Sequence, residues 1–117
     1  MVRRSNEKNV EFKPAPFGGV GDITVRHLVS GPAEMYEKGR VFAHSTLEPG
    51  CGIGYHIHEA DSELFYVIKG TASYDDNGTK TVLCAGDVAI TPAGSGHSVK
   101  NESDEDVELI ALIVYAD

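Results

Sequence analysis

Two short segments, each opening on a glycine, set the strongest limits on what this chain can fold into and bind. The first segment runs from Gly50 to Gly70, and the second runs from Gly86 to Asn101. Glycine and proline punctuate both segments, which is typical of short strands joined by tight turns. Together they carry four side chains that can ligate a metal ion: His56, His58, Glu63 and His97.

The first segment places two imidazoles on one face of a predicted strand. Side chains alternate along a strand, so His56 and His58 are expected about 6.6 Å apart on the same side. Both rings can then reach one ion at roughly 2.0–2.2 Å. The polar residues 59–62 predict a turn, and the apolar run 64–68 predicts the next strand. An antiparallel neighbour would return Glu63 beside the two imidazoles.

The second segment adds a third imidazole. His97 follows residues 91–96, which include one proline and two glycines that can bend the backbone sharply. Three imidazoles and one carboxylate suit a divalent transition metal. Manganese is our first choice, with iron, nickel, zinc, cobalt and copper as alternatives. We interpret the two histidines outside the segments, His27 and His44, as hydrogen-bonded core residues and not as ligands.

The two segments resemble the two signature motifs of the cupin superfamily at all ten motif positions. The 15 residues between them, 71–85, resemble the short spacer of a microbial single-domain cupin. Residues 40–117 as a whole resemble small oxalate-decarboxylase-like cupins. The resemblance implies an all-β fold, a double-stranded β-helix or jelly-roll β-barrel. It also implies that the three motif histidines and the motif glutamate point inward and bind the metal.

The expected metal centre favours a small anionic ligand. Four ligands in an octahedral site leave two positions for water or a bidentate substrate, and one glutamate does not neutralise a divalent ion. Larger oxalate decarboxylases have a substrate-binding arginine where this chain has Ile53. If the substrate is a dianion, another cation must supply the positive charge that this arginine provides, and Arg26 and Lys100 are two candidates besides Arg40. The pocket residues that we expect are Arg40, Tyr55 and Phe65.

The hydrophobic pattern predicts ten short strands in one domain. A chain of 117 residues can bury between about 60 and 70% of its unfolded surface, enough for one core. We expect residues 1–39 to form an N-terminal arm and the first strands of the same domain as the barrel, 40–117. A helical turn or irregular loop is expected between Gly31 and Gly39. The predicted strands are 10–12, 23–29, 41–47, 54–58, 64–69, 71–75, 80–83, 88–91, 97–101 and 108–115.

Charge and cysteine content narrow the partners and the location. Eighteen acidic and ten basic residues give a net charge of −8, which disfavours nucleic acid and anionic membranes. The two cysteines, Cys51 and Cys84, form no close pair, and no window of about 20 apolar residues occurs, so we expect a cytoplasmic protein.

Apolar residues on both faces of the strand 64–69 predict a homodimer that covers the outward face.

Three functions fit the predicted centre. The first is a metal-dependent enzyme, a lyase or oxygenase, that acts on a small carboxylate or hydroxy acid. The second is a metal-dependent sugar or uronate isomerase, in which the ion polarises a carbonyl while a base moves a proton. The third is a non-catalytic module that binds a small ligand. Fold and function are loosely linked, so all three stay open at this point.

Overall fold

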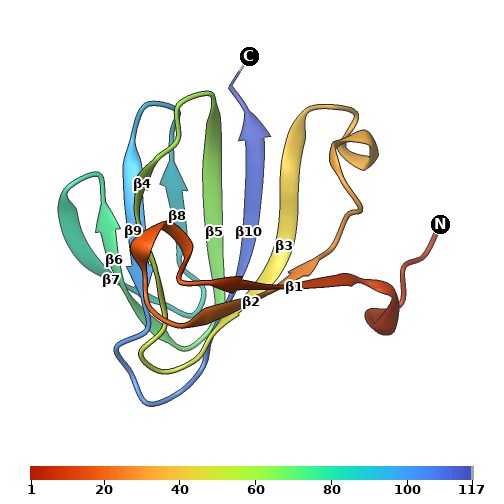
Figure 1. The fold of residues 1–117 in the computed structure, drawn as a ribbon. Coiled ribbons are helices and arrows are strands. Elements are labelled where there is room, and N and C mark those ends of the chain that lie inside the picture. Colours follow the sequence, from red (N-terminus) through yellow and green to blue (C-terminus); the bar gives the residue numbers. More distant parts are fainter. Residues whose placement is uncertain (117) are drawn as a thin grey trace.

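A computed structural model describes residues 1–116, which form two antiparallel sheets packed against each other (Figure 1). The strands are β1 (Asn9–Pro14), β2 (Asp22–His27), β3 (Gly39–Leu47), β4 (Gly52–Ile57), β5 (Asp61–Lys69), β6 (Thr71–Asp76), β7 (Thr79–Cys84), β8 (Val88–Thr91), β9 (Gly96–Lys100) and β10 (Val107–Tyr115). One sheet has six strands in the order β1-β2-β3-β10-β5-β8, and the other has four in the order β4-β9-β6-β7.

The predicted all-β jelly-roll fold is confirmed, and each of the ten expected strands is present with its ends moved by a few residues. The expected helical turn is the 3₁₀ helix η3 (Pro32–Met35). Two further 3₁₀ turns, η1 (Ser5–Glu7) and η2 (Pro16–Gly18), were not expected. The last residue of the predicted barrel, Asp117, lies outside the described residues. Among residues 1–116, no helix has the length and apolar character needed to span a bilayer.

One expected pairing is wrong. Residues 59–62 were predicted as a turn between two neighbouring strands, but β5 already begins at Asp61, and β4 and β5 belong to different sheets. The residues between these strands carry the chain from the four-stranded sheet to the six-stranded sheet. Glu63 therefore meets the histidines across the interior of the sandwich, and it does not lie on a paired neighbour.

The core fills the space between the two sheets. On β5, the alternate residues Glu63, Phe65 and Val67 are buried, while Tyr66 is 47% exposed, as strand alternation predicts. The fully buried aliphatic side chains come from both sheets and include Ile23, Leu47, Val67, Val99, Val107 and Leu109. This core gives the inward-facing polar residues a rigid support.

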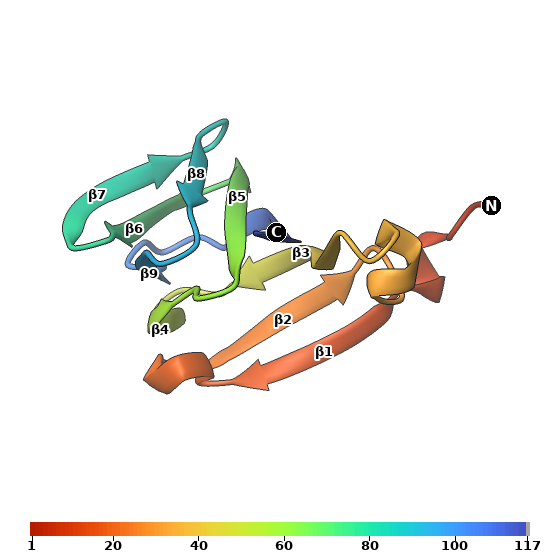
Figure 2. The same cartoon turned by 90° about the horizontal axis from the view of Figure 1, so that it is seen from above.

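The first 39 residues extend the larger sheet. β2 pairs with β3 from Thr24 to His27 and places Ile23 and Val25 in the core. β1 pairs with β2 at the sheet edge, and all its residues are exposed. Figure 2 shows that the turn between β1 and β2, which contains η2, lies beside β4.

Candidate metal centre

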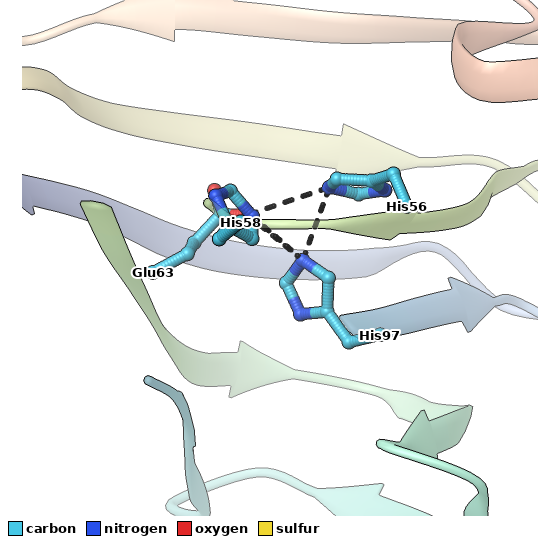
Figure 3. A group of neighbouring side chains, drawn as sticks. All are labelled: His56, His58, Glu63 and His97. Atoms are coloured by element: carbon cyan, nitrogen blue, oxygen red, sulfur yellow. Dashed lines mark hydrogen bonds and ion pairs between the residues drawn. The ribbon is translucent and has the colours of Figure 1, made fainter. Parts of the chain in front are cut away.

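Both sheets supply the candidate centre (Figure 3). His56 lies on β4 directly opposite His97 on β9, and His58 follows the last residue of β4. Glu63 comes from β5 in the other sheet. The 92–96 loop is attached to the first segment, because the His58 backbone nitrogen donates to Ser95 at 3.0 Å and the Gly94 nitrogen donates to the His58 carbonyl at 2.5 Å. These two hydrogen bonds fix the position of the second segment relative to the first.

The four side chains aim one atom each at a common point. One nitrogen or oxygen from each residue lies within 4.8 Å of the others, and this group could hold a metal ion. Glu63 Oε1 lies 3.0 Å from Nε2 of both His58 and His97, and Nε2 of His97 lies 3.2 Å from Nε2 of His56. Two ligands about 2.1 Å from one ion and at right angles lie about 3 Å apart, so these separations suit a shared cation.

The opposite ring nitrogens are occupied by hydrogen bonds. Nδ1 of His56 lies 2.8 Å from the Gly54 carbonyl, and Nδ1 of His58 lies 2.7 Å from Asp61 Oδ1. Both acceptors require a proton on Nδ1, which leaves the Nε2 lone pair of each ring free to face the common point. This tautomer is the one that binds a metal through Nε2.

His97 is held by two hydroxyl groups. Its Nδ1 lies 2.8 Å from the Tyr74 hydroxyl and 2.9 Å from Thr91 Oγ1, and all three side chains are buried. Burial raises the pKa of Tyr74 to about 12, so its hydroxyl stays protonated at neutral pH. The ring of His97 is thus fixed in the interior, where it also stacks on Phe65 with centroids 5.1 Å apart.

The electrostatics of the group also favour a cation. Burial would raise the pKa of Glu63, but hydrogen bonds with His58 and His97 outweigh it and bring the pKa to about 2. The hydrogen bond with Glu63 raises the pKa of His58, while burial lowers the pKa of His56. A buried carboxylate that stays ionised needs positive charge beside it, and a divalent ion supplies that charge without protons on Nε2.

Arg40 is connected to the centre through Asp61. Arg40 Nε donates to Asp61 Oδ2 at 2.8 Å, while Asp61 Oδ1 accepts from His58. Burial would raise the pKa of Asp61, but the hydrogen bonds from Arg40 and His58 lower it, so this carboxylate is ionised. The contact between Asp61 and His58 resembles a carboxylate–histidine–metal arrangement, in which the outer carboxylate orients the histidine that binds the metal.

A cavity of about 130 Å³ opens beside the histidines. Arg40 and Phe65, two of the three expected pocket residues, contribute to its lining. Tyr55 does not, because alternation along β4 turns it away from His56, and it is 48% exposed. Ile53 lines the cavity and provides no charge. The remaining lining residues are Lys13, Pro16, Phe17, Ile23, Val25, Val41, Ala43, Ser45, His56, His58, Glu63, Leu109, Ala111 and Ile113.

The other charged and polar candidates lie away from this cavity. Arg26 donates to Thr46 Oγ1 at 2.8 Å, and neither Arg26 nor Lys100 belongs to the lining. His27 and His44 contact Glu11 and Glu108 at 2.9 and 2.8 Å, so their prediction as hydrogen-bonded residues is confirmed. Their placement in the core is wrong, because both side chains are only half-buried and their glutamate partners contact solvent.

Sequence reasoning missed several residues around the centre. Asp61 stands three residues after His58, and this spacing could have marked it as a partner of the ring. Lys13 and Phe17 come from the N-terminal segment, far from either motif in the sequence, and no local signal marks them. They reach the cavity because β1 and β2 extend the sheet that forms one of its walls.

The comparisons with known proteins agree with this fold. Residues 43–115 match the family model described as a cupin domain. A curated oxalate-binding protein of Thermotoga maritima is 39% identical over 114 residues, covering 97% of this chain and 93% of the relative. A solved structure from the same organism, described as a predicted oxalate decarboxylase, has a TM-score of 0.92 and 37% identity. That alignment covers 98% of this chain and 99% of the other.

A more distant structure shares the fold. It is described as a cupin-superfamily sugar phosphate isomerase from Silicibacter pomeroyi, with a TM-score of 0.77 and 18% identity over 99% of this chain and 76% of the other.

The match to the cupin-domain model and the 39% identical relative show that the chain belongs to the cupin family. Within it, the chain is similar in sequence and structure to small proteins whose names refer to oxalate.

Proposed function

We propose that this cupin binds a divalent metal ion and holds a small dicarboxylate, oxalate or a close analogue, on that ion. The metal ligands in this proposal are His56, His58, Glu63 and His97. The observation that carries the proposal is the set of charges around the cavity. The name of the Thermotoga maritima relative, an oxalate-binding protein, supports the choice of ligand.

The charges at the cavity favour a dianion over a neutral ligand. A divalent ion, Arg40 and Lys13 together exceed the two carboxylates of Glu63 and Asp61 by two positive charges. The rest of the lining is mostly aliphatic and adds no further charge, while Arg40 and Lys13 keep contact with water. A dicarboxylate neutralises this excess, and its oxygens are suitable ligands for the ion.

Arg40 is the residue that we assign to the carboxylate not bound by the metal. Its Nε is used by Asp61, and no hydrogen bond among residues 1–116 uses its two Nη atoms. The side chain is 45% exposed, which leaves the guanidinium accessible from the cavity. A guanidinium can donate two parallel hydrogen bonds to one carboxylate. Arg40 thus takes the role that an arginine at position 53 would have had.

Of the three candidate functions, binding of a small ligand without a chemical reaction is the one that the cavity supports best. Within the described residues, its lining contains no carboxylate or imidazole beyond the metal ligands, and the other side chain there that commonly transfers a proton is Lys13, which is exposed on the edge strand β1. This arrangement argues against the isomerase. A lyase or oxygenase is the second candidate, because a bound metal would act as a Lewis acid on the acid it holds.

The metal that we propose is manganese. Manganese prefers oxygen ligands, and Glu63 together with the oxygens of a bound acid would supply them. The three imidazoles also suit iron, nickel, zinc, cobalt and copper, which are the alternatives. Elemental analysis of the purified protein distinguishes among them.

We also propose that the protein is a homodimer. The outward face of the larger sheet carries two cross-strand rows of apolar residues. One row is Ile90, Leu64, Leu112 and Phe42, and the other is Val88, Tyr66 and Ile110. Several of these side chains are exposed by 37% or more. A second copy of the same sheet would cover them in a two-fold symmetric contact.

Three further expectations stay predictions: the cytoplasmic location, the absence of nucleic-acid binding, and the assignment of residues 1–39 to the same domain as 40–117. Limited proteolysis tests the last of these. A shared domain predicts that the 1–39 segment resists cleavage as long as the barrel does, since β2 packs Ile23 and Val25 into the core.

The proposed function is tested by titrating oxalate into manganese-loaded protein by calorimetry, while the same samples are assayed for formate and carbon dioxide. We expect one oxalate per chain and no product. Arg40→Gln should weaken oxalate binding at least tenfold, and Arg26→Gln, an arginine outside the cavity, should not change it. Formation of product would favour the lyase, and equal affinity of the two variants would refute the role of Arg40.

A further inference from the structure

The turn between β1 and β2 has an unusual backbone. Ala15 and Phe17 adopt positive φ values of 38° and 53°, in the left-handed region that residues with a side chain rarely occupy. Backbone hydrogen bonds close the turn, from Ala15 to the Gly21 carbonyl at 2.9 Å and from Gly19 to the Pro16 carbonyl at 3.0 Å. Such strain persists only where the surrounding structure holds it in place.

Two glycines seat this turn directly on β4. A Cβ atom on Gly54 would lie 1.9 Å from the Phe17 carbonyl oxygen, and a Cβ on Gly19 would lie 2.1 Å from the Gly52 carbonyl oxygen. The bridge between Val20 and Gly52 adds backbone hydrogen bonds of 3.2 and 2.8 Å. No larger residue allows the two backbones to approach this closely, so glycine sets the position of the turn.

The result is that Phe17 lies over a candidate metal ligand. Its ring stacks on the ring of His56 with centroids 3.9 Å apart and planes 10° apart. Phe17 is nevertheless 66% exposed, so it contributes little to the core. It lines the same cavity as Arg40, His56 and His58. Core packing does not explain an aromatic side chain in this place, and its position between solvent and the cavity suits contact with a ligand.

We propose that Phe17 is a specificity-determining residue that contacts the bound acid and limits its size. This inference rests on the proposed binding of a small dicarboxylate. The ring forms the wall of the cavity on the His56 side and excludes water from the metal centre there. An acid with a bulky substituent would have to displace the ring, and the turn cannot shift without separating the glycine contacts with β4.

The test compares the affinities of oxalate, malonate and phenylmalonate for manganese-loaded protein by calorimetry. Wild-type protein is expected to bind phenylmalonate at least a hundredfold more weakly than malonate, which has the same backbone without the bulky ring, while oxalate reports that the centre binds a small acid. Phe17→Ala should reduce this ratio at least tenfold. Gly19→Ala, which keeps the ring but lifts the turn from Gly52, should reduce it in the same direction. Tyr36→Ala is the matched control, because Tyr36 is an exposed aromatic with the same φ of 53° outside this cavity.

The outcomes separate this inference from the proposed function. If the acids bind and Phe17→Ala leaves the affinity ratio unchanged at wild-type metal content, the role of Phe17 is refuted and the proposed function stands. An equal change in Tyr36→Ala would also refute it. If no acid binds the wild-type protein, the proposed function and the role of Phe17 both fall. Thermal unfolding of each variant verifies that it is folded.

Discussion

Asp61 accepts a hydrogen bond from Nδ1 of His58 at 2.7 Å, and both side chains are buried. The second oxygen of the same carboxylate accepts from Arg40. One carboxylate thus orients a candidate metal ligand and holds the cation that we assign to the bound acid. The metal and the acid would therefore depend on each other through a single side chain.

Replacing Asp61 should weaken metal binding. Asp61→Asn keeps the size of the side chain but removes its charge, so the His58 ring loses the acceptor that fixes its tautomer. Loss of such an outer partner typically costs ten- to a hundredfold in metal affinity. Competition with a fluorescent chelator measures this change in manganese affinity. Asp22→Asn, an exposed residue on β2, serves as the control. Unchanged affinity in Asp61→Asn would contradict the assigned role.

Removing the Tyr74 hydroxyl should destabilise the protein even without metal. This hydroxyl contacts both His97 and Thr91 inside the core. Tyr74→Phe is expected to lower the free energy of unfolding by about 1 kcal/mol, since the other two groups still contact each other. Urea unfolding of metal-free protein measures the change. Tyr55→Phe, at an exposed position, should stay within about 0.5 kcal/mol of wild type, and an equal loss in both variants would contradict this account.

Acid should release the contact between Arg3 and Glu34. The hydrogen bond from Arg3, at 2.7 Å, lowers the pKa of Glu34 from 4.5 to about 2. A carboxyl group whose folded-state pKa is lowered stabilises the fold above its unfolded pKa, and this contribution disappears as pH falls from 4.5 to 2. The pair is exposed, so the effect is small.

Melting temperatures measured against pH test this expectation. Glu34→Gln should melt below wild type at pH 6, and the difference should close between pH 4.5 and about 2. Glu37→Gln is the neighbouring control. A difference between Glu34→Gln and wild type that is as large at pH 2 as at pH 6 would show that the effect does not come from the ionised carboxylate.

A charge on the outward face of the larger sheet should dissociate the proposed dimer. Ile90 is 57% exposed on β8, within one of the apolar rows. Ile90→Lys is expected to reduce the mass in light scattering from twice 12.5 kDa to the single-chain value. Val82→Lys, at a position 55% exposed on β7 in the other sheet, should remain dimeric. A single-chain mass for the wild-type protein would refute the dimer.

The sequence predicted the strands well, because strands follow local residue patterns, whereas the inward direction of the four motif side chains was implied by the resemblance to cupins. Alternation places Tyr66 on the face opposite Glu63 and Phe65, and the structure agrees. The pairing of Glu63 with the histidines was predicted in the wrong form. A polar segment such as 59–62 is equally typical of a hairpin turn and of a crossing between sheets, and only tertiary packing decides between them.

The contacts that support the centre could not be predicted, because their partners are distant in the sequence. Arg40 and Asp61 are 21 residues apart, and Phe17 meets His56 only because glycines bring the turn onto β4. The exposure of a phenylalanine or the ionisation of a buried aspartate cannot be read from residue type. Such contacts follow from packing, and they determine what the cavity can accept.

If the cupin centre binds its acid through a metal ion, oxalate binding must depend on that ion. Calorimetric titration of oxalate into one preparation, first stripped of metal with a chelator and then reloaded with manganese, tests this dependence. We expect no measurable binding to the stripped protein and one oxalate per chain after reloading. Equal oxalate affinity in both states, or no binding in the reloaded protein, would refute binding through the metal.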